Sequence, residues 1–508
     1  MSIPKSRWNG AWIILLAAVL RLVLLGMKPP HFDEGVNGWF VDQITKTGRF
    51  HYDPTNYHGP LHFYLLFLFQ TLLGRSIWVL RLPAVLASIG TVWLVLKFDR
   101  FLGSRVSKVA ALALALSPGA VFYGRYAIHE SELVLFLVLT LFGMIGLWRE
   151  GTVKYLWALT LGLTGMVLTK ETYIIHLGCF ILAAGCLWLL EKVSPSAEAA
   201  PAARQSWRRR DLLLCVVAGI GLIVFFYSGT FLDFKSLHGL YQCYAAWFQT
   251  GKEGHGHEKP FYYWFHPLML RYEWTALAGI ITAGYLLLPR QDRLMRYVAI
   301  YGCGAIAGYS IVHYKTPWCI ISLLWPFSLL FGYGIVQLSG KYPRTATSFL
   351  LSLLAVSGGW TIWLNFLHCV DEGEPYVYVQ TLNDVYKLVT PLEEIARQNP
   401  ANRHVTGHVM VSSYHPLPWM LGDFTGIGYY DQERTPDDLD GDFLLVEPDR
   451  VDDVEKALQK DYFTTPLQIR GSQDVSKLYL SVEKFRSVFP GRTPEFVPDH
   501  STGEPEGE

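Results

Sequence analysis

The chain has 508 residues, of which 51% are apolar, 15% aromatic and only 17% charged, and its formal net charge is zero. The charged fraction lies well below the roughly 25% typical of soluble proteins, so we predict a polytopic membrane protein. Because neither sign of charge is in excess, no nucleic acid or other charged polymer is expected as a partner. The seven cysteines are scattered without a C-x-x-C motif, which argues against a disulfide framework or a cysteine metal site.

The first apolar run, at 11–27, is predicted to be a retained membrane span. Lys5 and Arg7 precede it, as in a signal peptide, but the run contains Arg21 and ends in Met27-Lys28-Pro29-Pro30, where a cleavage site would need small residues. The loop 28–81 that follows is the first outer loop of this topology.

Ten later runs are also long enough to cross a membrane. They lie at 82–98, 106–122, 131–148, 154–169, 173–190, 212–228, 274–288, 297–313, 317–338 and 346–366. A further run, 61–73, is short for a span and is predicted to be a helix in the membrane plane. With eleven spans and this in-plane helix, the loops on the N-terminal side are the ones rich in lysine and arginine, so the N-terminus is predicted to be cytoplasmic.

After residue 366 the pattern becomes that of a soluble α/β domain. Short apolar runs at 405–411 and 443–446 predict strands, and 379–397 and 451–460 predict helices. The predicted domains are therefore a transmembrane domain at 1–368, an extracytoplasmic α/β domain at 369–498 and a disordered tail at 499–508.

An acidic pair, Asp33 and Glu34, follows the first span directly, in the run His31-Phe32-Asp33-Glu34-Gly35. A carboxylate at headgroup level is suited to activate a hydroxyl beside a lipid-linked substrate, since a neutral alcohol needs a base to become a good nucleophile. We therefore take Asp33 as a candidate general base, although an acidic pair on a surface is also common without any function.

Basic residues gather in the same outer loops. A departing lipid phosphate gains negative charge in the transition state, and fixed cations near it lower the barrier. The candidates for this role are His58, Arg81, Arg125, Lys170 and Lys315.

Structural interpretations of these residues also stand. Arg125 would snorkel to the interface, Lys170 and Glu171 would form a local ion pair, and Lys315 would be an interfacial anchor beside Trp318. The run 255–258, His-Gly-His-Glu, suggests either a metal site or, given its glycines, a mobile loop.

Taken in order, several short motifs resemble the GT-C glycosyltransferases of family 39, which include protein O-mannosyltransferases and the aminoarabinose transferases of lipid A. Within that group the chain is most similar to the prokaryotic flippase activity-associated proteins. The motifs are His31-Phe32-Asp33-Glu34, Tyr57-His58-Gly59-Pro60-Leu61, Arg81-Leu82-Pro83, Ser117-Pro118, Tyr123-Gly124-Arg125, Thr169-Lys170-Glu171, Tyr314-Lys315-Thr316-Pro317-Trp318, Glu374-Pro375-Tyr376-Val377-Tyr378-Val379 and His415-Pro416-Leu417-Pro418-Trp419.

The resemblance implies a GT-C fold and an inverting transfer of a sugar from a polyprenyl phosphate to a hydroxyl at the outer face. Asp33 would be the base and Glu34 would support it. Arg125 aligns with a family arginine, Glu130 stands where Asp is common, and His129 lies beside it. In place of the usual His-Pro-Pro or Lys-Pro-Pro, the chain has Gly59 after His58.

The resemblance also implies a multi-pass protein of a prokaryotic plasma membrane, with its C-terminal domain outside. The partners would be a polyprenyl-phosphate sugar and a lipid, glycan or protein acceptor. No metal-binding residue is assigned, and participation of a divalent metal is left open. Two other functions remain: a glycolipid flippase or flippase-associated protein without transferase chemistry, and a membrane-anchored module that binds a partner through its outer domain.

Overall fold

The computed structural model describes residues 10–197, 205–254, 256–431 and 434–498 and divides into two compact units. The first unit comprises Met1–Leu25 and Gln43–Tyr376, and the second comprises Gly26–Asp42 and Val377–Glu508. The division thus falls at Val377, whereas the sequence suggested residue 369, and the second unit also takes in part of the first outer loop. The predicted disordered tail, 499–508, lies outside the described residues.

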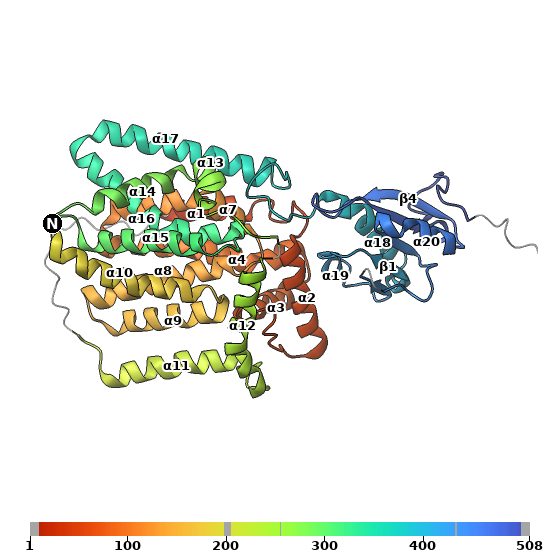
Figure 1. Ribbon diagram of the computed structural model, residues 1–508, viewed down its shortest axis with the longest axis horizontal. Helices are drawn as coiled ribbons and strands as arrows, with labels where there is room; N and C mark the ends of the chain where they lie inside the picture. The colour runs from red at the N-terminus through yellow and green to blue at the C-terminus, as the bar shows by residue number, and fades with distance from the viewer. Residues whose placement is uncertain (1–9, 198–204, 255, 432–433, 499–508) are drawn as a thin grey trace, which may run out of the picture. The chain divides into compact units, whose positions relative to one another are not determined.

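The first unit is built from helices, and in Figure 1 its long helices run roughly parallel or antiparallel to one another, with α12 crossing their direction. Its helices are α1 (Ala11–Leu22), α3 (Leu61–Leu73), α4 (Ile77–Lys97), α5 (Asp99–Leu102), α6 (Ser104–Ala115), α7 (Pro118–Phe122), α8 (Glu130–Arg149), α9 (Val153–Thr169), α10 (Tyr173–Val193), α11 (Arg209–Tyr227), α12 (Gly239–Glu253), α13 (Leu270–Tyr272), α14 (Trp274–Leu286), α15 (Arg293–Ile311), α16 (Ile320–Lys341) and α17 (Pro343–Ile362).

Each of the eleven segments predicted to span the membrane contains a helix. By length and composition, the described residues hold six helices fit to cross a membrane, or seven if the bent pair α6 and α7 counts as one span. The six are Ile77–Leu102, Glu130–Arg149, Tyr173–Val193, Arg209–Tyr227, Pro317–Lys341 and Pro343–Leu367. The total of eleven crossings stays a prediction. Helix α3 has the bounds predicted for the in-plane helix, and its orientation to the membrane also stays a prediction.

The bend of 64° between α6 and α7 has an identifiable cause. Pro118 stands in the first turn of α7, and the N-cap Ser117 accepts a hydrogen bond from the Ala120 amide at 3.3 Å. The last carbonyls of α6 are left without intrahelical donors. Arg21, buried in α1, donates to the carbonyls of Leu114 and Ala115 at 3.3 and 3.2 Å. This charged residue of the predicted first span therefore supplies the donors that the end of α6 lacks.

The second unit is the α/β domain that the sequence predicts. Its strands are β1 (Gly407–Met410), β2 (Ile427–Tyr429), β3 (Phe443–Val446), β4 (Tyr462–Leu467) and β5 (Ser476–Ser481), and its helices are α18 (Tyr386–Gln398), α19 (Leu417–Met420), α20 (Val451–Ala457) and α21 (Val482–Phe485). The sheet order is β2-β1-β3-β5-β4. Strands β2 and β3 run parallel to β1, whereas β5 is antiparallel to both β3 and β4.

Strand β3 explains why the domain has three layers. Phe443 and Leu445 join the core that includes residues of α18, while Leu444 and Val446 join a second core with residues of α20. All four side chains are fully buried. A strand covered on both faces reads as a continuous apolar run, which is the pattern that predicted it.

The N-terminal part of α2 (Phe32–Thr47) packs within this second unit. A Cβ added at Gly35 would lie 2.4 Å from the Cα of Pro416, and one added at Gly38 would lie 2.4 Å from the ring of Trp419. The two glycines are three residues apart and therefore share a face of the helix. Their lack of side chains lets α2 approach the segment 415–419 closely.

Candidate functional site

Helix α2 begins with a capping arrangement in which the two acidic residues of its first turn, Asp33 and Glu34, have different environments. The Glu34 carboxylate accepts a hydrogen bond from the backbone N–H of His31 at 2.8 Å, in the manner of a capping box. The Nδ1 atom of His31 accepts from the Asp33 backbone N–H at 3.1 Å, and its Nε2 donates to the Tyr378 carbonyl at 2.8 Å. Glu34 is fully buried and holds the start of the helix, whereas the Asp33 side chain is 38% exposed.

The His31 imidazole is neutral in this arrangement. Burial lowers its pKa, and the opposing effects of Asp33 and Glu34 do not offset that. A neutral ring with Nε2–H and a free Nδ1 lone pair is the tautomer that both of its hydrogen bonds require. The Asp33 carboxylate therefore has no cationic partner in His31, although their side chains approach to 4.0 Å.

Arg470 is the basic residue that the second unit brings to this end of α2. Its guanidinium lies 5.0 Å from the centre of the Phe32 ring and donates to the Ser413 carbonyl at 2.6 Å. The ring of His415 packs edge-on against Phe32 at 5.3 Å. Burial lowers the pKa of His415 to about 4, with a further lowering from Arg470 and an opposing effect of Asp33.

In the first unit, His58 is paired with Glu171. Their Nδ1 and Oε2 atoms are 2.9 Å apart, and the His58 side chain is 24% exposed while Glu171 is buried. Gly59 makes this approach possible, because its N–H donates to the Thr169 carbonyl at 3.0 Å and a Cβ there would lie 2.3 Å from the Leu168 oxygen. A proline at this position would lack that N–H, which gives a physical reason for the departure from His-Pro-Pro.

Lys170 does not pair with its neighbour in sequence. Its ammonium forms a buried ion pair with the Glu130 carboxylate. Burial lowers the pKa of Lys170, but Glu130, Cys319 and Glu171 together outweigh burial and hold that pKa well above the usual range. For Glu171, burial raises the pKa, while His58 and then Lys170 bring it below the usual value. The interpretation of Lys170 and Glu171 as a local ion pair is therefore wrong. Lys170 pairs with Glu130, and Glu171 pairs with His58.

His129 lies between two other imidazoles. Its ring centre is 4.6 Å from that of His58 and 4.3 Å from that of His62. The Nδ1 atom of His62 is 3.0 Å from Oε1 of Glu132, and both groups are buried. Burial, and then the neighbouring imidazoles, lower the pKa of His129 well below its usual value, so this ring is neutral. The Nε2 atoms of His62 and His129 are buried, and neither has a hydrogen-bond partner within the described part of the chain.

Arg81 and Arg125 both bind the end of α1. Arg125 is buried and donates to the carbonyls of Leu20, Val23 and Leu24 at 2.8–2.9 Å. Arg81, fully buried in α4, donates to the Leu25 carbonyl at 2.7 Å. These carbonyls are the unpaired acceptors of a helix C-terminus, where cations are favourable. Arg125 is therefore enclosed by protein, and the interpretation that it snorkels to the interface is wrong.

Lys315 is also buried and is held by a short backbone pairing. Its ammonium donates to the Lys259 carbonyl at 3.0 Å, while its own N–H donates to the His257 carbonyl at 3.0 Å. Burial lowers its pKa. His255 lies outside the described residues, and no group of three or more His, Cys, Asp or Glu among the described ones is arranged to hold a metal ion.

The structure thus brings five of the ten predicted site residues into one cluster of the first unit. They are His58, His129, Glu130, Lys170 and Glu171. The roles predicted for them, and for Asp33 and Glu34 in the second unit, stay predictions. The cluster supplies an ammonium and a partly exposed imidazole, each paired with a carboxylate that an incoming phosphate could replace.

Sequence reasoning missed His62 and Glu132 in this cluster and Arg470 beside α2. Two signals were available for the first pair. His62 lies four positions after His58, and it is an ionisable residue in a mostly apolar helix, which is a recognised indication of function in a membrane protein. No local pattern indicates Arg470, which lies 437 positions after Asp33 in the sequence and approaches Phe32 only in the folded chain.

Comparisons with known proteins gave one family match and several matches of fold. Residues 57–198 match the family model described as dolichyl-phosphate-mannose-protein mannosyltransferase. No curated protein gives a significant match in sequence. Several solved structures do match in fold.

One of these is the crystal structure of ArnT from Cupriavidus metallidurans bound to undecaprenyl phosphate. It has a TM-score of 0.59 and 14% sequence identity, covering 93% of this chain and 98% of that chain. The apo state of the same protein matches with a TM-score of 0.59 and 13% identity over 92% and 97% of the two chains. An oligosaccharyltransferase of Archaeoglobus fulgidus in complex with Zn and sulfate gives a TM-score of only 0.48, with 11% identity over 93% and 72%.

At these identities the ArnT likeness shows a shared fold. The third match is too distant to carry an argument about metal. The narrower resemblance to flippase activity-associated proteins stays a prediction. The wider resemblance is confirmed: the chain is a membrane protein with the GT-C glycosyltransferase fold, and its residues 57–198 match the protein mannosyltransferase family.

Proposed function

We propose that this protein is an inverting glycosyltransferase that moves a sugar from a polyprenyl phosphate to an acceptor hydroxyl at the outer face of a prokaryotic plasma membrane. The observation that carries this proposal is the state of Asp33, an exposed carboxylate fixed at the first turn of α2 by the buried Glu34 cap. The fold shared with a structure bound to undecaprenyl phosphate supports the donor class, and so does the match to a family that uses a dolichyl-phosphate sugar.

Asp33 would remove the proton from the acceptor hydroxyl as that oxygen attacks the anomeric carbon of the sugar. The bond from that carbon to the phosphate oxygen breaks, and the polyprenyl phosphate leaves with the electron pair. A single displacement of this kind inverts the configuration. Glu34 and His31 are positioning residues, because their hydrogen bonds hold the helix start from which Asp33 projects.

The donor phosphate would bind to the cations of the first unit. His58 is the most accessible basic residue of the cluster, and a phosphate oxygen would take the place of Glu171 as its partner. Lys170 would add a fixed positive charge behind it, with Glu130, Glu171 and His129 in supporting positions. Arg81 and Arg125 would stabilise the phosphate through their positive charge from the end of α1, and Lys315 would do so from the loop before α16.

This chemistry implies a topology, with the N-terminus in the cytoplasm and the second unit outside. The acceptor would be a lipid, glycan or protein hydroxyl. The scheme assigns no step to a metal ion.

The experiment compares polyprenyl-linked sugars in four cell lines by mass spectrometry of lipid extracts: cells lacking the protein, and the same cells carrying wild type, Asp33→Asn or Asp42→Asn. Asp42 lies on the same helix and serves as the matched control. Removing a general base slows turnover by roughly 100- to 10,000-fold, so one polyprenyl-phosphate sugar should accumulate in the deletion and Asp33→Asn lines only.

Restoration of the wild-type lipid profile by Asp33→Asn would overturn the proposal and favour lipid flipping without bond chemistry. Protein levels of both variants are compared in the same membranes, so that loss of the protein is not mistaken for loss of turnover.

A further inference from the structure

The second unit contains a cavity where its parallel strands end. Ser412 follows β1, and Glu447 follows β3 directly. The chain passes from β1 to β2 on one side and then returns to β3 on the other side of β1, so the strand order reverses between β1 and β3. In open α/β sheets, ligands bind at the carboxyl ends of the strands at such a reversal. The cavity measures about 420 Å³, within the roughly 300–1,000 Å³ of small-molecule sites.

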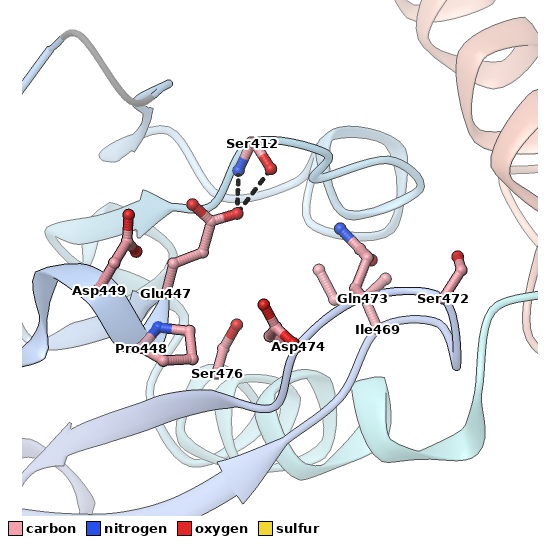
Figure 2. A pocket seen from close by; sticks show the side chains of 9 residues that line it. All are labelled: Ser412, Glu447, Pro448, Asp449, Ile469, Ser472, Gln473, Asp474 and Ser476. Atoms are coloured by element: carbon pink, nitrogen blue, oxygen red, sulfur yellow. Dashed lines mark hydrogen bonds between the residues drawn. The ribbon is translucent and has the colours of Figure 1, made fainter. Parts of the chain in front are cut away.

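The lining of this cavity is almost entirely polar. Figure 2 shows Glu447 and Ser412 on one side and the side chains of the loop between β4 and β5 on the other. The complete lining is Ser412, Glu447, Pro448, Asp449, Ile469, Ser472, Gln473, Asp474 and Ser476. It includes three carboxylates, one amide and three hydroxyls but no basic side chain, so it is rich in hydrogen-bond acceptors.

Two of these groups are held in fixed orientations by the protein. The Oε1 atom of Glu447 accepts from the N–H and the hydroxyl of Ser412 at 2.7 and 2.6 Å. Gln473 donates its amide N–H to the Ser413 carbonyl at 3.1 Å, which leaves its Oε1 atom as the free end. That oxygen is buried and has no hydrogen-bond partner among the described residues. Buried polar atoms are almost always paired, so this unpaired acceptor in a residue that lines the cavity marks a place where a donor is lacking.

The chemistry of the lining restricts the ligand. Three carboxylates without a cation repel phosphate and other anions, so neither the lipid phosphate nor a nucleotide fits here. The polar lining does not suit a lipid chain. A ligand with many O–H or N–H donors and one small apolar face, to lie on Ile469 and Pro448, satisfies every group present.

We propose that this cavity binds a sugar unit that is neutral or carries an amino group. The identification of this sugar with part of a glycan acceptor rests on the proposed transferase function, but binding itself does not. The second unit would then select acceptors by their hydroxyl pattern, through Glu447, Gln473 and Asp474, independently of the donor chemistry.

The test measures binding of free saccharides to the full-length protein in nanodiscs by saturation-transfer difference NMR. The probes are mannotriose, which is neutral, the fully deacetylated trimer of glucosamine, which carries amino groups, and mannose 6-phosphate, which is anionic. The variants are Gln473→Leu, Ser472→Ala and Asp474→Asn. Gln459→Leu, an exposed glutamine outside the cavity lining, is the matched control, and a thermal unfolding scan verifies that each variant is folded.

We expect saturable binding of mannotriose or the glucosamine trimer and none of mannose 6-phosphate. Each of Gln473→Leu and Asp474→Asn should weaken binding by about tenfold, which is the effect of losing one well-made hydrogen bond. Ser472→Ala is a conservative exposed substitution and should weaken binding less, while the control should bind as wild type does.

Absence of saturable binding by both non-anionic probes, equal binding of the anionic one, or unchanged binding in all three cavity variants would overturn the proposal. Asp33→Asn should bind saccharide as wild type does. Saccharide binding could therefore be observed even if the transferase proposal failed. Likewise, absence of saccharide binding would not contradict the transferase proposal.

Discussion

The charged residues of the two units differ in what they are paired with. In the first unit, Lys170 is paired with Glu130, and His58 and His62 are each paired with a carboxylate, in largely buried positions. In the second unit, Asp33 and the cavity carboxylates form no ion pair with a charged partner among the described residues of that unit.

The difference separates charged groups that are paired inside the protein from carboxylates that remain accessible to a ligand. A buried charge without a partner is costly, so the first unit pairs the basic residues of its cluster with carboxylates and gives Arg81, Arg125 and Lys315 backbone carbonyls as acceptors. Exposed carboxylates keep their hydration and stay available. An accessible carboxylate such as Asp33 in the second unit is therefore suited to act as a base. The basic residues of the first unit are suited to bind an anion.

The largest expected effect in this comparison comes from breaking the buried pair. Lys170→Met leaves the Glu130 carboxylate buried and unpaired, which should lower the free energy of unfolding by about 3–5 kcal/mol. The double variant Lys170→Met with Glu130→Gln should recover most of the loss. Unfolding in a denaturing detergent measures both. A loss below about 1 kcal/mol in the single variant would show that the pair is not buried as described.

Next comes the close packing of α2. Gly35→Ala gains about 1 kcal/mol of helix propensity but forces a methyl group against the backbone of Pro416, and overpacking of this kind costs about 1–3 kcal/mol. We expect net destabilisation and reduced activity together. Gly178→Ala in α10 is the control. A Cβ added at Gly178 would have no heavy atom outside its own helix backbone within 4 Å, so this variant should be neutral or stabilising. Equal stability of the two variants in a thermal scan would contradict the close approach.

A smaller effect is expected from the cap of α2. Glu34→Gln weakens the hydrogen bond to the His31 N–H and should cost about 0.5–2 kcal/mol. If Glu34 only positions Asp33, the variant should lower kcat moderately while leaving the pH profile of kcat/KM in place. A shift of that profile would indicate that Glu34 shares the proton with Asp33.

The smallest effect is a pH dependence in the second unit. Because burial lowers the pKa of His415 from about 6.5 to about 4, the unfolded chain binds a proton in this range that the folded chain does not. Stability should therefore be full above pH 6.5, fall as the pH drops from 6.5 to 4, and lose this dependence below 4. Calorimetry of the full-length protein measures it, and His415→Gln should remove this part of the slope. If the pH dependence of stability is unchanged in His415→Gln, it arises from other groups, of which His31 is the first candidate.

The sequence by itself determined the apolar segments, the helix at 61–73 and the α/β character of the C-terminal domain. These features depend on hydrophobic patterns within one segment, so neighbouring residues are enough to reveal them. It also indicated most members of the cluster around Lys170, because their motifs are local.

Only the tertiary structure decided which charges meet. His58 and Glu171 are 113 positions apart, and Lys170 pairs with Glu130, 40 positions away, and not with its neighbour. The structure likewise placed Asp33 in the unit of Arg470, and formed a cavity from the ends of β1 and β3. Such contacts depend on how distant segments pack, and no pattern within a single segment carries that information.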